Sequence, residues 1–300
     1  MATKTPSAYE MRAIKAIHVW KNPKKRWYNK ALSVVNWPID KTSTLVMKTP
    51  GVNWVITKAI GGLVSILNDF AHLTVRSEAI YKEFRSMGCE VRKSHDIFSL
   101  DLEHIDKAIG SLGVKYKSLA LVEGGGTGFV GLPGIPADIV AVVSMNQRAI
   151  GEYATYCGFD VSLQEERQFA MNILGCASST NDVAKQAAMA NLARLAKNAA
   201  MKKPWIVLEE SVFTKIIQSF VPRLTKAKLA QILPLTGAAI GGRFNVYFTN
   251  KVCNTAYFVY RERFLAEKYG PNIIKSYGES VEGLSFSDDG GEIDSVPFGI

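Results

Sequence analysis

Cysteine is scarce in this 300-residue chain, and no two cysteines form a C-x-x-C pair. The four are widely scattered: Cys89, Cys157, Cys176 and Cys253. This excludes a disulfide scaffold and a zinc knuckle, and it suits a reducing compartment. The first 12 residues also contain no apolar run, so we expect no signal peptide and a cytoplasmic location.

Long uncharged runs are also missing, although 47% of the residues are hydrophobic and can form a sizeable core. Three stretches are apolar and rich in small residues: 49–73, 118–150 and 229–260. Charged side chains interrupt each of them before 18 consecutive uncharged residues are reached. Because a spanning helix needs about 20 mostly apolar residues, we expect no transmembrane segment.

Alternating polar and apolar runs between Asn-Gly or Asp-Gly turns are missing too, which argues against a β-rich fold. Helical patterns occur almost throughout. Ser162 and Glu165 have the spacing of a capping box, Gly88 lies where a helix C-cap would, and residues 181–201 predict an Ala-rich, tightly packed helix. We therefore predict an all-α, multi-helix bundle.

The second and third apolar stretches each begin with a Gly- and Pro-rich entry that leads into a long helix. The first of these helices is expected from about Ala137, and the second to about Lys268. One interpretation is a pair of close-packed core helices, and the other is a pair of hydrophobic hairpins that dip into a bilayer or line a lipid-sized cavity. The glycines of the first entry are Gly124, Gly125, Gly126, Gly128, Gly131 and Gly134.

Recognisable catalytic and cofactor motifs are missing or unconvincing. Gly126 to Gly131 matches G-x-G-x-x-G, but Pro133 and Pro136 break the helix that a nucleotide site needs, and no P-loop lysine follows. No two histidines have the i, i+4 spacing of a helical zinc site, and no G-x-S-x-G elbow is present. The sequence assigns no catalytic residue, metal or cofactor.

Charge is present but unevenly distributed. The chain carries a net charge of +9; residues 1–48 contribute +8, from ten basic and two acidic side chains, whereas residues 279–300 contribute −6. We therefore divide the chain into a basic, aromatic N-terminal arm (1–48), a helical domain (49–278) and an acidic, weakly ordered tail (279–300).

Basic and aromatic side chains alternate within the arm. Lys and Arg attract anionic headgroups, and Trp and Tyr rings prefer the membrane interface. The same composition also suits a nucleic acid, which we disfavour, or a solvated helix whose tryptophans pack on the body. The candidate lipid-contacting residues are Trp20, Lys24, Lys25, Arg26, Trp27, Tyr28 and Lys30.

Several polar side chains lie inside the apolar stretches. Burying an unpaired charge costs several kcal/mol, so we expect these residues to be paired or solvated, for example Asp138 with Arg243 across two helices. They form either structural pairs or a functional polar site in a hydrophobic groove. The candidates are Glu123, Asp138, Arg148, Arg243 and Asn245.

Residues 124–174 resemble the EcsC protein family of bacteria. The resemblance is carried by the Gly-rich entry, Asp138, the Arg-Ala-Ile of residues 148–150, and the aromatic-x-Gly-aromatic-Asp pattern that ends at Asp160. The segments LPLTGAAIGGRFN and RERFLAEKY, up to Tyr269, look like the second half of that family. The resemblance implies a bacterial envelope context near an ABC transporter, and it supplies no catalytic residue.

Three functional hypotheses follow. The first is a non-catalytic peripheral membrane protein at the inner face of the cell membrane, which binds anionic lipid or acyl chains. The second is an accessory protein of an ABC transporter or a secretion machine, which contacts protein rather than lipid. The third is a hydrolase of a hydrophobic substrate that uses Glu123 or Asp138 as an acid or base. The oligomeric state stays open.

Overall fold

The computed structural model describes most of the helical body. The described residues are 5–22, 50–68, 75–126, 132–179, 182–200, 237–274 and, between them, 217, 218, 221, 222, 224, 225, 228 and 229. Within these residues all regular structure is helical and no strand occurs, so the predicted all-α fold is confirmed. The acidic tail and most of the basic arm lie outside the described residues.

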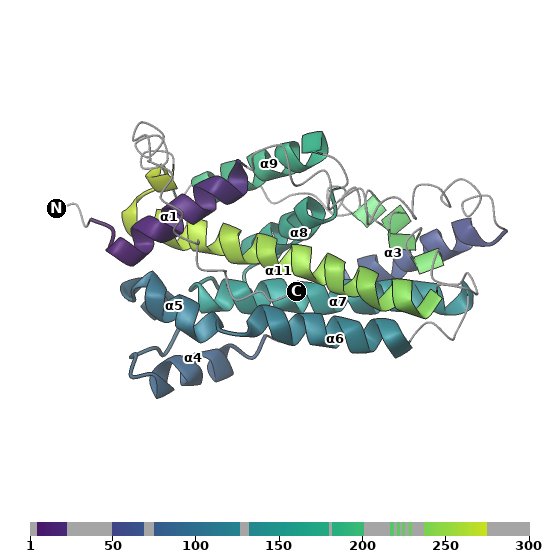
Figure 1. The fold of residues 1–300 in the computed structure, drawn as a ribbon, viewed down its shortest axis with the longest axis horizontal. Helices are drawn as coiled ribbons and strands as arrows, with labels where there is room; N and C mark the ends of the chain where they lie inside the picture. The colour runs from purple at the N-terminus through teal and green to yellow at the C-terminus, as the bar shows by residue number, and fades with distance from the viewer. Residues whose placement is uncertain are drawn as a thin grey trace, which may run out of the picture.

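The longest helix, α11 (Gly237–Tyr269), runs through the centre of the molecule (Figure 1). Its 33 residues correspond to a length of about 50 Å. The helix α6 (Leu112–Gly126) packs along α11 in the opposite direction, and α7 (Ile135–Tyr156) packs against both. The paired side chains Lys115 and Glu152 at one end, and Glu123 and Asn245 at the other, fix these directions.

The remaining helices surround this centre. The helix α3 (Val52–Asn68) packs on α7, where Gly62 leaves room for Val140: a Cβ at Gly62 would come within 2.9 Å of Val140 Cγ2. The other elements are α1 (Ala8–Lys21), α4 (Ser77–Ser86), α5 (Leu102–Ile109), α8 (Gln164–Ala177), α9 (Asp182–Ala200) and the 3-10 turns η2 (Ser94–Ser99) and η4 (Leu132–Gly134).

The predicted helix boundaries are largely confirmed. The Ala-rich helix is α9, the helix expected to reach about Lys268 ends at Tyr269, and Gly88 follows α4 with φ +82°. The capping box predicted at Ser162 is wrong, because α8 begins at Gln164 after Leu163, which has no side chain that can cap. A capping box does occur at the start of α1, between Ser7 and Glu10.

No helix among the described residues is long and apolar enough to cross a membrane. This agrees with the charged side chains that interrupt each apolar stretch. The helix α11 carries charged side chains although it is largely buried. Because an unpaired buried charge is costly, each of these buried charges needs a partner.

Candidate functional site: a buried carboxyl cluster beside an exposed apolar face

Three of the five predicted groove residues meet in one place. Glu123 in the last turns of α6, Asp138 in the first turn of α7 and Asn245 near the start of α11 join Lys228 in a group that we call the carboxyl cluster. Lys228 Nζ lies 2.7 Å from Asp138 Oδ2, and Asn245 Nδ2 donates a hydrogen bond of 2.7 Å to Glu123 Oε2. The sequence thus identified the carboxylates but not their cation.

The carboxyl cluster is shielded from solvent. Asp138, Lys228 and Asn245 are buried, and Glu123 is half-buried with its Oε1 atom inside the protein. Asp138 obtains a cross-helix partner, as predicted, but the described partner is Lys228. The side chain of Arg243, the partner that we expected, lies outside the described residues.

Two carboxyl groups share one ammonium group in this cluster, and this determines the protonation of Glu123. The pKa of Glu123 is raised from 4.5 to about 8: burial and the hydrogen bond with Asp138 raise it, and the charge of Lys228 only partly opposes them. Glu123 therefore keeps its proton at neutral pH. A carboxyl group in this state can donate a proton, and the neighbouring carboxylate can accept one.

An exposed apolar face lies directly beside the cluster on α6. Four of its side chains point to solvent, and the most exposed are Val122 (75%) and Leu121 (56%). Because α6 also buries apolar residues such as Tyr116 against the core, apolar side chains lie on both the buried and the exposed side of the helix. We call this surface the α6 face, and its members are Val114, Leu119, Leu121 and Val122.

The other predicted groove residue with a described side chain, Arg148, lies elsewhere. Its side chain is 47% exposed, and its Nε atom lies 3.4 Å from Glu152 Oε1, one turn farther along α7. Glu152 also pairs with Lys115 at 2.7 Å. Arg148 is ten residues from Asp138, about 15 Å along the helix, so the structure does not bring it to the carboxyl cluster.

The structure describes only part of the Gly-rich segment (124–134) and only part of the basic arm (1–48). Among the glycines, Gly124, Gly125 and Gly126 end α6 and Gly134 ends η4, whereas Gly128 and Gly131 lie outside the described residues. Trp20, at the end of α1, is half-buried and stacks on Phe258 with ring centroids 4.9 Å apart. The remaining arm candidates lie outside the described residues: Lys24, Lys25, Arg26, Trp27, Tyr28 and Lys30.

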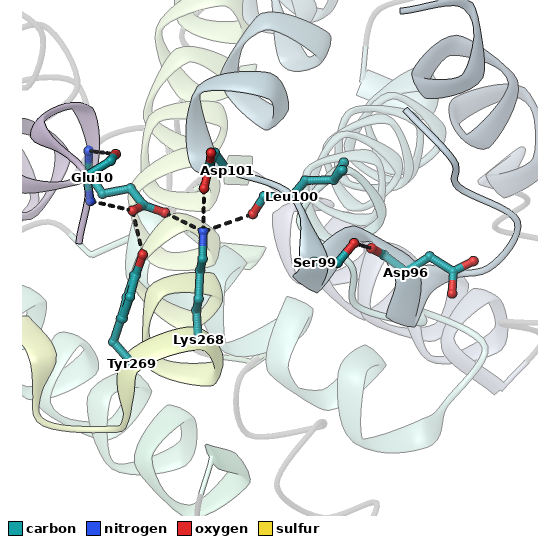
Figure 2. Close-up of polar contacts among 8 residues, drawn as sticks. Glu10, Asp96, Ser99, Leu100, Asp101, Lys268 and Tyr269 are labelled. Atoms are coloured by element: carbon teal, nitrogen blue, oxygen red, sulfur yellow. Dashed lines mark hydrogen bonds and ion pairs between the residues drawn. The ribbon is translucent and has the colours of Figure 1, made fainter. Parts of the chain in front are cut away.

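Sequence reasoning missed a second polar group at the opposite end of α11, which we call the α1 anchor: Glu10, Asp101, Lys268 and Tyr269 (Figure 2). Lys268 Nζ donates to Glu10 Oε1 at 2.9 Å, to Asp101 Oδ1 at 2.8 Å and to the Leu100 carbonyl at 3.1 Å. Tyr269 donates to Glu10 Oε2 at 2.6 Å. The Ser7-to-Glu10 capping spacing was the available signal for the start of α1, but it does not reveal these distant partners.

Glu10 is fully buried and yet ionised. Burial alone would raise its pKa, but hydrogen bonds from Tyr269, the Ser7 backbone and Lys268 outweigh burial and hold the pKa below its ordinary value. Lys21 adds a second link between α1 and α11, through Glu262 at 2.7 Å. The end of α1, from which the basic arm continues, is therefore fixed to the body.

The other buried charges of α11 are closed ion pairs. Arg263 binds Glu166 through two hydrogen bonds of 2.6 Å, and its guanidinium lies 3.9 Å from the ring centroid of Phe159. Arg261 pairs with Asp106 at 2.7 Å. Arg261, Arg263 and Glu166 are buried, and the side chain of Asp106 is only 9% exposed, so we assign these pairs a structural role.

Nucleophile and metal chemistry find little support in the described residues. All four cysteines are buried, and burial raises the pKa of Cys157 and Cys253, which keeps those thiols protonated and unreactive. Within the described ranges, no group of three or more His, Cys, Asp or Glu side chains could hold a metal ion. The carboxyl cluster and the α6 face are the features left to explain.

Comparison with known proteins gives a family. The model of the EcsC protein family matches residues 11–265. Two proteins of Bacillus subtilis (strain 168) are similar: the uncharacterized protein YdbA, 24% identical over 262 residues, and Protein EcsC, 28% identical over 176 residues. The match with YdbA covers 85% of this chain and 92% of YdbA. The match with Protein EcsC covers 58% of this chain and 70% of Protein EcsC. No solved structure matches the chain.

Proposed function

The chain belongs to the EcsC protein family, and we propose that it is a non-catalytic peripheral membrane protein that binds an anionic bilayer at the inner face of the cell membrane. The α6 face carries this proposal. A water-exposed helix normally shows polar side chains on its outer side, whereas α6 exposes Leu119, Leu121 and Val122 there. Several exposed apolar side chains on one helix are typical of surfaces that meet lipid or another protein.

The expected binding energies favour a membrane contact that combines the α6 face with the basic arm. Complete burial of one aliphatic side chain is worth about 1.5–3 kcal/mol, and the α6 face offers only a few partly exposed ones. Such a face alone gives weak, reversible attachment, and stable attachment requires a second signal such as a basic segment. The arm supplies that signal, because each Lys or Arg near an anionic surface adds about 1 kcal/mol.

The described end of α1 fixes the place where the basic residues of the arm begin. Lys21 and Trp20 tie the end of α1 to α11, so the basic residues that follow begin at a fixed point on the body. Lys58 adds exposed positive charge on α3. An anionic bilayer is the occupant that satisfies both the apolar side chains and the positive charge.

The experiment is flotation of the full chain with neutral and with anionic phospholipid vesicles at low and high salt. We expect a Leu121→Ser, Val122→Ser double variant to float at least tenfold less with anionic vesicles, and most clearly at high salt. Leu163→Ser, which alters an equally exposed leucine on another element, is the control and should float normally.

The contribution of the arm is tested by charge rather than by deletion. Removal of residues 1–48 would also remove α1, whose Ile14 and Ile17 belong to the core. Replacement of Lys24, Lys25 and Arg26 by Gln leaves α1 intact and should abolish the salt-sensitive part of flotation. If the wild-type chain floats with neither kind of vesicle, the proposal is wrong, and a protein partner in a membrane complex becomes the better occupant of the α6 face.

A further inference from the structure

We propose that the carboxyl cluster is a proton-binding site in which Glu123 and Asp138 hold one proton, and that release of this proton weakens the contact of the α6 face with a bilayer. The second half of this inference rests on the proposed function. The first half concerns the folded protein alone and can be tested without lipid.

The charges in the cluster require a bound proton. Among the residues that the structure describes, the groups that face Glu123 are the Asp138 carboxylate from α7, the Lys228 ammonium, and the neutral Asn245 amide from α11. Lys228 lies 2.7 Å from Asp138 Oδ2 and balances one negative charge. Two carboxyl groups within hydrogen-bonding distance in a shielded site do not both ionise, so the second one keeps its proton. The cluster is then neutral as a whole.

The position of Glu123 in α6 gives its proton access to solvent and couples its charge to the α6 face. Glu123 follows Leu121 and Val122 directly in α6, and its side chain is half-buried, so its proton can exchange with solvent. When the proton leaves, the apolar end of α6 acquires one negative charge. A charge at that position has to be dehydrated when the α6 face meets hydrocarbon, and it is repelled by anionic headgroups.

The pKa of Glu123, raised to about 8 by burial and by the hydrogen bond with Asp138, sets the range in which this occurs. If only the protonated form brings the α6 face to the bilayer, binding stays nearly constant below pH 7. By linkage it then becomes about tenfold weaker between pH 7 and pH 9. Deprotonation of the lysines of the arm would also weaken binding to an anionic surface, but it begins only at higher pH, so the pH range distinguishes the two effects.

The first experiment measures the proton directly. The infrared carboxyl band of the full-length wild-type chain is followed from pH 5 to pH 10 without lipid. We expect one protonated carboxyl group to titrate near pH 8 and its band to be missing in Glu123→Gln. If no carboxyl group of the wild-type chain titrates above pH 6, the proton-binding site is overturned, and this result does not depend on the folding of any variant.

The second experiment measures the coupling. Flotation with phosphatidylcholine vesicles at high salt removes the electrostatic contribution of the arm. We expect about tenfold weaker binding at pH 9 than at pH 7 for the wild-type chain, and no such change for Glu123→Gln. Glu90→Gln, which alters a fully exposed glutamate, is the matched control and should behave like the wild type.

The outcomes separate the two proposals. Equal pH dependence of the wild type and Glu123→Gln overturns the coupling. No binding to any vesicle at either pH, with an infrared titration near pH 8, overturns the proposed membrane function and the coupling together, while the proton-binding site is supported.

Discussion

A glutamate lies near each end of α11, fully buried in the case of Glu10 and half-buried in the case of Glu123, and the two glutamates are in opposite protonation states. Glu10, in the α1 anchor, is the more deeply buried of the two, yet its pKa is lowered, whereas the pKa of Glu123 in the carboxyl cluster is raised to about 8. The difference lies in the partners. Glu10 accepts hydrogen bonds from an ammonium, a phenol and a backbone amide. Glu123 faces a carboxylate that already uses the nearby ammonium.

This comparison shows that the depth of burial alone does not decide the charge of a carboxyl group. The number of donors aimed at it does, because each donor stabilises the ionised form that burial disfavours. The α1 anchor is therefore a structural device that fixes α1 to the end of α11. The carboxyl cluster has the spare proton that a responsive site requires.

Lys268→Met should have the largest effect on stability. It leaves Glu10 buried without its cation, and removal of one partner of a buried pair costs about 3–5 kcal/mol. Urea unfolding at pH 7, followed by circular dichroism, measures this loss. Lys21→Met, which breaks the partly exposed pair with Glu262, is the control and should cost about 1 kcal/mol or less. Equal losses for the two variants would remove the special role of the α1 anchor.

Lys228→Met should have the next largest effect on stability. We expect the free energy of unfolding to fall by about 3 kcal/mol at pH 8 and by less towards pH 5. The carboxyl cluster can respond to the lost cation by taking up a second proton, and this uptake is easier at lower pH. Unfolding curves at the two pH values measure the difference. Lys115→Met, at a half-exposed pair with Glu152, should show a small loss. A loss for Lys228→Met that is equally large at pH 5 and pH 8 would contradict the shared-proton arrangement.

Glu10→Gln should destabilise the protein by about 2 kcal/mol at pH 7, the order expected for hydrogen bonds to a charged group. Because the pKa of Glu10 is lowered in the folded state, its contribution is present above the ordinary value of 4.5 and is lost as the pH falls through the folded value. Thermal unfolding of the variant and the wild type should therefore converge in acid. A difference that is constant from pH 7 into acid would argue against an ionised Glu10.

Glu123→Gln should change the stability with the opposite sign. Because the pKa of Glu123 is raised, its contribution to stability is fully present below 4.5 and is lost as the pH rises towards about 8. The variant should match the wild type near pH 4, and by pH 8 it should be the more stable of the two. Thermal unfolding across this range measures the change. A variant that becomes relatively less stable as the pH rises would show that Glu123 is ionised in the folded protein.

Local patterns in the sequence were enough to predict most helices and part of the candidate site. Apolar periodicity placed α9 and the end of α11, and the glycine at position 88 marked the end of α4. Glu123, Asp138 and Asn245 could be singled out because polar side chains inside apolar stretches need partners. The same rule also selected Arg148, which finds its partner on its own helix and is largely exposed.

The sequence by itself thus determined the helical fold class, the uneven charge along the chain and the positions that needed a partner, because each of these depends on neighbours a few residues apart. Only the tertiary structure decided which partner each residue has. Lys228 reaches Asp138 across 90 residues, and Lys268 reaches Glu10 across 258. Such pairs form when helices that are remote in sequence bury apolar faces against each other, and helical periodicity carries no information about which faces meet.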